Sequence, residues 1–268
     1  MRPKRDGRNS SRDGGGGKGG IKERIDPFSS QNFIVDGMAA VAEYVRFRPA
    51  SLLEIRCIRQ QRVAVNELLS KHQVKVPVFE QGDDSGDEAS APVTARVGLK
   101  AMDFEACLKR LAGRTKDVVL ALDHITDPRN LGAIVRSAAF FGVREVIVPE
   151  RRQVLLTQAA VNTAQGGFAL SDLVVVTNLN RSLGELKKQG YWLIGTEMAG
   201  EPFQKLAHVY DKTVIVLGAE DVGLSKGISE SCDRLAAISG TVGGLDSLNV
   251  SVAAGIILCE FTRPAPRS

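Results

Sequence analysis

The chain has 268 residues, of which 43% are hydrophobic and 25% are charged, an ordinary balance for a globular protein with one large domain or two smaller ones. Its four scattered cysteines do not have the spacing of a zinc site or a redox motif, and its three histidines show no metal spacing. No apolar run is long enough to span a bilayer, so we expect a cytoplasmic protein with reduced thiols and no metal or membrane partner.

The charge is unevenly spread along the chain. Residues 1–25 hold eight Lys or Arg against three Asp or Glu and are rich in glycine, so we expect residues 1–27 to form a disordered basic arm. The segment from Glu80 to Glu88 holds five acids and no base. Outside these two segments the chain is mildly basic, which suits a polyanionic partner; the alternative is a solvated tail that only aids solubility.

Residues 28–100 are predicted to form a small α/β unit. Its patterns indicate helices over residues 38–44 and 63–71 and strands over residues 52–55 and 74–79. The acidic, turn-rich stretch near residues 80–92 is predicted to be a loop or linker. Residues 93–117 are ambiguous, with a possible helix over residues 104–111.

From residue 118 onward, strands alternate with helices. Apolar runs predict strands over residues 118–122, 145–148, 173–176, 192–195, 214–217 and 235–238. Periodic segments between and after them predict helices over residues 131–141, 156–164, 183–188, 228–232 and 249–261. This alternation indicates a parallel sheet covered by helices on both faces.

Three clusters of glycine and polar residues stand out in this α/β pattern. One runs from Asn130 to Arg136, the second is Gly218 to Glu220, and the third is Ser247 to Asn249. Ligands of parallel α/β sheets bind beyond the carboxyl ends of the strands, so one site assembled from several loops is predicted. The alternatives are structural: helix capping by the polar side chains, a surface arginine and an ordinary strand-to-helix turn.

Two enzyme classes are disfavoured. No G-x-G-x-x-G fingerprint follows the strand at residues 118–122, which argues against a nicotinamide-dependent enzyme, and no Walker A sequence is present, which argues against an NTPase.

The three clusters together resemble the motifs of the SpoU (TrmH-like) branch of the SPOUT RNA methyltransferases, over roughly residues 118–262. The first motif starts at Asn130 and includes Arg136, the second runs from Leu217 to Leu224, and the third from Gly243 to Ala254. One departure is visible, because Ser239-Gly240-Thr241 stands where the family usually has an Ile-Pro-Met-like run.

The resemblance implies an α/β fold with a parallel-sheet SPOUT domain over residues 101–268, tied into a trefoil knot although knots are otherwise nearly absent from proteins. Residues 28–100 resemble an L30e-like RNA-binding domain. The resemblance also implies a homodimer with the site close to the subunit interface. It implies that S-adenosylmethionine binds in the knot, with the following candidate contacts: Thr196, Leu217, Gly218, Ile238 and Leu248.

The function implied is methyl transfer to a ribose 2′-hydroxyl of RNA, most simply a guanosine of large-subunit (23S-type) rRNA, because the tRNA enzymes of this group usually lack the leading unit. The candidate catalytic residues are Asn130, Arg136, Glu220, Ser247 and Asn249. The candidate RNA contacts are Arg46, Arg48, Arg56 and Arg59. Two alternatives stay open: a tRNA guanosine 2′-O-methyltransferase, and a catalytically silent RNA-binding assembly factor on the same fold.

Overall fold

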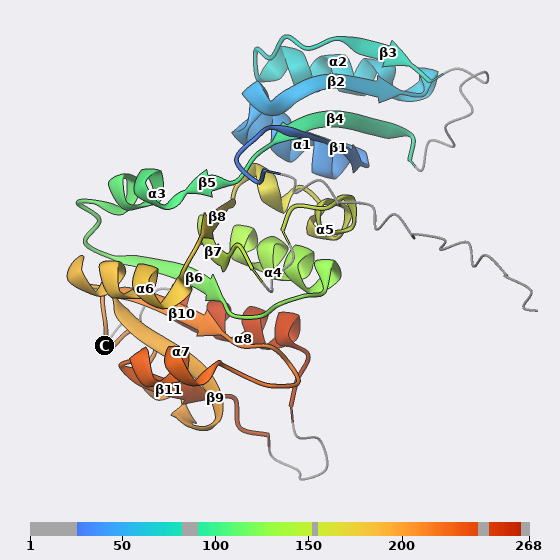
Figure 1. The fold of residues 1–268 in the computed structure, drawn as a ribbon. Helices are drawn as coiled ribbons and strands as arrows, with labels where there is room; N and C mark the ends of the chain where they lie inside the picture. The colour runs from blue at the N-terminus through green and yellow to red at the C-terminus, as the bar shows by residue number, and fades with distance from the viewer. Residues whose placement is uncertain (1–25, 82–90, 152–154, 241–246, 264–268) are drawn as a thin grey trace, which may run out of the picture.

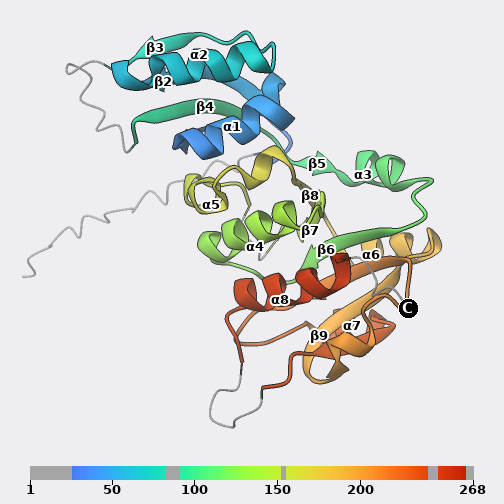
Figure 2. The ribbon, with the colours of Figure 1, turned by 180° about the vertical axis from the view of Figure 1, so that it is seen from behind.

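The computed structural model describes residues 26–81, 91–151, 155–240 and 247–263, which form two sheets with their helices. The smaller sheet is built from β1 (Gln31–Asp36), β2 (Leu52–Cys57), β3 (Val78–Glu80) and β4 (Val93–Leu99), in the spatial order β1-β4-β2-β3. Strand β4 is antiparallel to β1 and β2, and β3 is parallel to β2. The helices α1 (Met38–Phe47) and α2 (Arg62–Lys71) cover one face of this sheet (Figures 1 and 2). We call this part, residues 26–99, the N-terminal unit.

The sequence pattern predicts too long a third strand in the N-terminal unit. The alternation predicts a strand over residues 74–79, which starts four residues too early. Strand β3 covers only Val78–Glu80, and its one partner in the sheet is β2. Pro77 carries no N–H, so it cannot donate to a ladder. The ambiguous stretch after residue 92 holds the central strand β4, a two-residue strand β5 (Met102–Asp103) and the helix α3 (Phe104–Leu111).

The larger sheet has seven strands, and all of its pairings are parallel, as the alternation predicts. Its spatial order is β11-β9-β10-β6-β7-β8-β5. Besides β5, its strands are β6 (Asp117–Leu122), β7 (Glu145–Pro149), β8 (Asp172–Val176), β9 (Trp192–Pro202), β10 (Lys212–Leu217) and β11 (Arg234–Ala237). The trefoil knot stays a prediction.

Helices cover both faces of the larger sheet. Helices α4 (Pro128–Phe140), α5 (Gln158–Ala164) and α8 (Val250–Thr262) lie on one side, and α3, α6 (Leu179–Lys188) and α7 (Lys226–Ser231) lie on the other (Figure 1). Strand β6 shows why both faces must be apolar. Leu120 and Leu122 pack into the core on the α4 side, whereas Val119 and Ala121 pack into the core on the α6 side.

The apolar core on the α4 side continues into the N-terminal unit, so the two sheets share one cluster of buried side chains. Two polar contacts reinforce this junction. Gln158 of α5 accepts the Ile34 N–H at 2.9 Å and donates to the Ile34 carbonyl at 2.6 Å, which occupies the free edge of β1. Arg48, just after α1, forms an ion pair with Asp172 at the start of β8.

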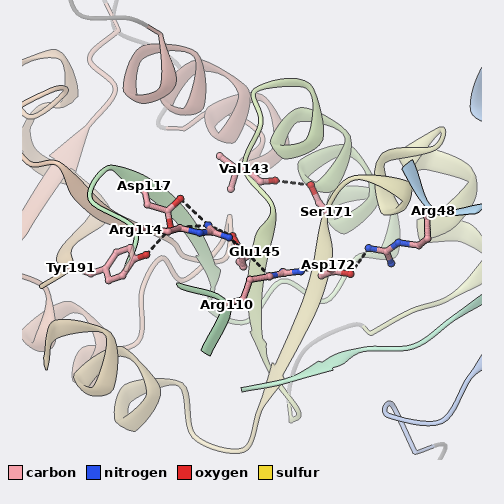
Figure 3. Close-up of polar contacts among 9 residues, drawn as sticks. All are labelled: Arg48, Arg110, Arg114, Asp117, Val143, Glu145, Ser171, Asp172 and Tyr191. Carbon is pink, nitrogen blue, oxygen red and sulfur yellow. Dashed lines mark hydrogen bonds and ion pairs between the residues drawn. The ribbon is translucent and has the colours of Figure 1, made fainter. Parts of the chain in front are cut away.

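The amino ends of three neighbouring strands carry a charged network (Figure 3). Asp117, Glu145 and Asp172 are the first residues of β6, β7 and β8. Arg114 pairs with Asp117 at 3.0 Å and with Glu145 at 2.9 Å. Arg110 pairs with Glu145 at 2.8 Å and with Asp172 at 2.6 Å. The network therefore joins three strands and α3 to one another, and it reaches the N-terminal unit through the pair made by Asp172.

The network is partly withdrawn from water. Burial disfavours the charge on Arg114, but hydrogen bonds and charges from Glu145 and Asp117 outweigh it and raise the pKa of the guanidinium. Burial, followed by the hydrogen bond from the Tyr191 hydroxyl to Asp117 at 2.6 Å, raises the pKa of that phenol. Both side chains therefore keep their ordinary protonation states, Arg114 charged and Tyr191 neutral, throughout the pH range in which proteins are stable.

We predict that Glu145→Ala lowers the free energy of unfolding by about 1–3 kcal/mol, because it removes a fully buried (0% exposed) carboxylate that Arg110 and Arg114 share, while each arginine keeps its second partner. Urea denaturation followed by circular dichroism measures the loss. The matched control is Glu185→Ala, which removes an exposed pair with Lys188 and is expected to cost less than about 1 kcal/mol. Equal costs for the two variants would contradict a structural role for the network.

Candidate active site

A cavity of about 360 Å³ lies beyond the carboxyl ends of β10 and β11 and beside the middle of β9, on the edge of the sheet opposite the charged network. The apolar part of the cavity wall includes Leu224 and Ile257, and the polar part includes Glu220 and Ser247. All five residues that the family resemblance suggests for the cofactor line this cavity: Thr196, Leu217, Gly218, Ile238 and Leu248. A volume in this range matches ordinary small-molecule pockets.

Gly218 lines the cavity and also has a structural task. A Cβ at Gly218 would lie 2.2 Å from the backbone carbon of Gly223. The loop folds back on itself, with Ala219 and Gly223 exchanging two backbone hydrogen bonds of 3.1 and 2.8 Å. Gly223 has a φ of +67°, which L side chains rarely adopt. These two glycines therefore close a tight loop, and Glu220 lies within it.

The three motifs meet at the side chain of Asn249. Its Nδ2 donates to Asn130 Oδ1 at 3.1 Å and to Glu220 Oε2 at 3.2 Å. Its Oδ1 accepts the Ser251 N–H at 2.9 Å, so Asn249 also caps α8. Capping and site formation are thus compatible here, because the oxygen serves the helix while the NH₂ group serves the other two motifs.

Asn130 is not the cap of its own helix. Asp127 occupies that position and accepts the Arg129 N–H at 2.8 Å, with Pro128 in the first turn. Helix α4 therefore begins three residues earlier than the pattern predicts, and Asn130 lies in its first turn. Because the backbone end is already satisfied, the Asn130 side chain is available to the site.

Arg136 lies apart from this cluster. Six residues at about 100° each place it on a different side of α4 from Asn130. Its guanidinium is exposed and forms no ion pair or hydrogen bond with any residue that the structure describes. The structure thus joins Asn130, Glu220 and Asn249 within one chain, whereas Arg136 projects into solvent from the same helix as Asn130.

Ser247 lines the cavity and is exposed. Ser239 and Gly240, which depart from the family pattern, follow Ile238 but do not line the cavity. Thr241 and the glycine pair of the third motif fall in residues 241–246, outside the described ranges.

Sequence reasoning missed Asp123, which is only 3% exposed at the end of β6. Its Oδ2 accepts the Ser225 N–H at 2.8 Å, and its Oδ1 pairs with His124 Nδ1 at 2.6 Å. Asp123 therefore ties the end of β6 to the residue that follows the second motif. An acid directly after an apolar strand was the available signal, but it is equally typical of a surface turn.

Glu197 and Met198 were also missed, and both line the cavity. The pattern ends the strand at Gly195, whereas β9 continues to Pro202 and pairs again with β11 after a register shift. Gly200 makes this possible, since a Cβ there would lie 2.6 Å from the backbone of Ala236.

The four arginines predicted to bind RNA fall into two groups. Arg46, Arg56 and Arg59 are exposed on the N-terminal unit; Arg46 pairs with Glu43 at 3.3 Å and Arg56 with Glu54 at 2.9 Å. Arg48 differs, because its guanidinium is committed to Asp172 at the junction with the larger sheet. A junction residue is a poor phosphate contact, so we do not retain Arg48 as one.

In the described ranges, no group of His, Cys, Asp or Glu side chains is arranged to hold a metal ion. No helix in those ranges has the length and apolar character needed to cross a membrane.

Comparison with curated proteins identifies close relatives. The chain is 42% identical over 173 residues to the 23S rRNA (guanosine-2′-O-)-methyltransferase RlmB of Coxiella burnetii. The matched segment covers 63% of this chain and 69% of that protein. It is 40% identical over 185 residues to the enzyme of the same name from Pseudomonas aeruginosa, covering 68% and 73%. It is 41% identical over 146 residues to a Mycolicibacterium gilvum protein named "Uncharacterized tRNA/rRNA methyltransferase", but it spans about half of that protein (46%).

Solved structures share the fold over most of the chain. The SpoU methyltransferase AviRb from Streptomyces viridochromogenes, in complex with AdoMet, superposes with a TM-score of 0.71 at 23% identity, covering 86% of this chain and 89% of that one. An AdoMet-bound rRNA methyltransferase from Sinorhizobium meliloti gives 0.68 at 20% identity, covering 86% of both.

The family model described as the SpoU rRNA Methylase family matches residues 117–259, which hold β6 to α8 and all three motifs. This range is more than half of the chain and contains the cavity and the Asn249 cluster. The chain therefore belongs to the SpoU rRNA methylase family.

Proposed function

We propose that this protein transfers the methyl group of S-adenosylmethionine to a ribose 2′-hydroxyl of RNA, and that its substrate is a guanosine of large-subunit rRNA. The observation that carries the proposal is the meeting of three separate motifs at Asn249, directly beside a cavity of cofactor size. The names of the Coxiella and Pseudomonas relatives supply the substrate class.

The residues at the cavity fit this cofactor. Apolar side chains such as Leu217, Leu248 and Ile257 can cover an adenine ring, and backbone groups at the ends of β10 and β11 can bond its edge. Carboxylates at Glu197 and Glu220 suit its hydroxyls or its ammonium group. When bound, the cofactor supplies a methyl group already activated by a sulfonium, so the protein's task is to position the acceptor hydroxyl and help remove its proton.

The Asn249 cluster is suited to the positioning task. Hydrogen bonds to Asn130, Glu220 and the amino end of α8 hold the Asn249 amide in one orientation. Asn130 and Glu220 keep further polar capacity that can face a ribose, and Ser247 lies at the cavity edge. A rigid polar group beside the cofactor reduces the entropic cost of aligning the 2′-hydroxyl.

Arg136 suits an electrostatic role. A guanidinium rarely gives up its proton in proteins, so Arg136 is a poor general base. Exposed and without an anionic partner among the described residues, it can bind a phosphate of the target nucleotide and favour the developing alkoxide. An oxygen of that phosphate is then the proton acceptor.

We predict that Arg136→Ala abolishes turnover while RNA affinity stays within several-fold, because one phosphate contact among many is lost but the guanidinium that favours the alkoxide is removed. Single-turnover transfer of tritiated methyl and filter binding measure the two effects. Arg144→Ala, an exposed arginine before β7, is the matched control and keeps both. Near-normal activity of Arg136→Ala would exclude this role.

The function itself is tested by incubating the protein with tritiated S-adenosylmethionine and undermodified large-subunit rRNA or, in parallel, total tRNA, followed by nuclease mapping. Label recovered as 2′-O-methylguanosine in rRNA supports the proposal. Label in tRNA would retain the chemistry and reject the substrate. RNA binding with no transfer to either would instead identify a silent assembly factor.

We further propose that the N-terminal unit is the L30e-like domain predicted over residues 28–100 and that it holds the RNA. We propose that the basic residues of the arm predicted over residues 1–27 assist it; Asp26 and Pro27 belong to the N-terminal unit, and residues 1–25 lie outside the described ranges. Exposed Arg46, Arg56 and Arg59 support this role. Arg56 also lies over the ring of Phe79, with its guanidinium carbon 5.9 Å from the ring centre, which adds an aromatic surface of the kind on which bases stack.

Replacing Arg46, Arg56 and Arg59 together by alanine is predicted to weaken rRNA binding and to reduce the slope of log K against log salt by about two to three, because each phosphate contact contributes about 0.7–0.9. Fluorescence anisotropy over a salt series measures this slope. Arg181→Ala on α6 is the control. A triple variant with the parental slope would mean that the RNA contacts lie elsewhere.

We propose that the protein is a homodimer that pairs through α8. Val252 is 50% exposed and Ile256 is 37% exposed, and both lie on one side of this helix. Phe140, at the end of the adjoining α4, is 82% exposed. Such an apolar stripe is typical of an interface, and its helix begins at Asn249, so the partner would lie next to the site. We also propose that the protein acts in the cytoplasm on its rRNA substrate.

The variant Val252→Asp is predicted to shift the protein from two chains to one in light scattering and to lower methyl transfer at least about tenfold, because a buried unpaired carboxylate opposes association. Val63→Asp, at an exposed valine on α2 of the N-terminal unit, keeps the native mass. A wild-type protein that is already monomeric at micromolar concentration would reject the dimer.

A further inference from the structure

One glycine pair packs against both the N-terminal unit and the helix that carries Arg136. Gly166 and Gly167 connect α5 to a short 3₁₀ helix, Gly167–Ala169, and both are buried. The chain turns sharply here, with a φ of +49° at Gln165 and +89° at Gly166. A reversal of this kind brings consecutive residues against different neighbours.

Gly166 faces the N-terminal unit. A Cβ at this position would lie 3.2 Å from the Cα and from the carbonyl oxygen of Ala40 in α1, and 3.2 Å from the Cβ of Glu43. Gly167 faces the opposite way. A Cβ there would lie 3.1 Å from the Cα of Arg136, 3.2 Å from its backbone nitrogen and 3.2 Å from the carbonyl oxygen of Val135. Two neighbouring residues without side chains thus hold the backbones of α1 and α4 at close range.

The turn has little freedom to yield. The Ala169 N–H donates to the Gly166 carbonyl at 2.9 Å, and the buried Ser171 Oγ donates to the Val143 carbonyl at 2.6 Å, so the 3₁₀ helix is fixed to the start of β7. On the other side, Gln158 clamps the backbone of Ile34 through two hydrogen bonds. Close-packed backbone contacts transmit a displacement rather than absorb it.

We propose that the turn at Gly166 and Gly167 is the joint that sets the position of Arg136 relative to the N-terminal unit, and that Gly167 is a positioning residue for methyl transfer. The proposal rests on the role proposed above for Arg136. RNA held by the N-terminal unit and a nucleotide held by Arg136 are then kept in a fixed relation, so the joint selects which nucleotide of a structured RNA reaches the cofactor cavity.

The test introduces a methyl group on either side of the joint, with Gly166→Ala pressing on α1 and Gly167→Ala pressing on the backbone of Arg136. We expect each variant to slow single-turnover methyl transfer by about threefold to tenfold, because the added Cβ requires its neighbour to move by a few tenths of an ångström and a misplacement of about 1 Å can cost about a hundredfold. Affinities for rRNA and for S-adenosylmethionine, measured by anisotropy and calorimetry, are expected to stay within about threefold, because neither residue lines the cavity or is among the exposed arginines.

Gly190→Ala is the matched control for backbone strain. Gly190 has a φ of +87°, close to that of Gly166, but a Cβ there would meet nothing within 4 Å. It is expected to lose stability while retaining the wild-type rate per folded molecule. If Gly167→Ala transfers methyl within twofold of Gly190→Ala, the joint is rejected.

Gln158→Ala provides a second route should the glycine variants fail to fold, because it releases the Ile34 clamp without adding an atom. It is expected to slow transfer with RNA affinity retained, and a wild-type rate would reject the proposal. Arg136→Ala is assayed in parallel. An active Arg136→Ala would refute the role of the arginine itself, whereas an inactive Arg136→Ala beside a fully active Gly167→Ala would refute the joint alone.

Discussion

The candidate site depends on the side-chain amide of Asn249, whose oxygen and nitrogen serve different parts of the structure. The oxygen of Asn249 caps α8, and its nitrogen bonds Asn130 and Glu220, so a helix start and a site are built by the same side chain. The first N–H groups of any helix lack intrahelical partners and need other acceptors. By using an asparagine rather than a serine for this purpose, the chain gains two donors that hold the first and second motifs against the third.

The opposite edge of the sheet carries charges that serve the structure. Glu145 and its neighbours at the amino ends of β6, β7 and β8 are held by two arginines, and this network extends to Arg48 of the N-terminal unit. Burial makes such a network costly to assemble and more costly to break. Structural charges therefore occupy one edge of the larger sheet, and the polar groups available to a ligand occupy the other.

The sequence predicts much of this arrangement, because a parallel sheet leaves a strong pattern. Apolar runs locate six strands of the larger sheet, and the five residues that the family resemblance suggests for the cofactor all line one cavity. Local pattern is weaker where a boundary depends on tertiary contacts. Strand β9 continues past Gly195 only because Gly200 lets β11 approach, and β3 is short because Pro77 precedes an edge strand.

Two features of the site could not be predicted from the sequence, since they depend on how loops fold in space. Gly218 serves the loop's own closure, which only the contact with Gly223 reveals. The separation of Arg136 from the Asn249 cluster follows from helical geometry, but the residues that lie against the Arg136 backbone do not. Its backbone meets Gly167, and through that turn it meets the N-terminal unit, although Ala40 and Arg136 are far apart in sequence. Helix α4 and the N-terminal unit thus meet at one turn within one packed core, and close packing transmits a displacement from one to the other.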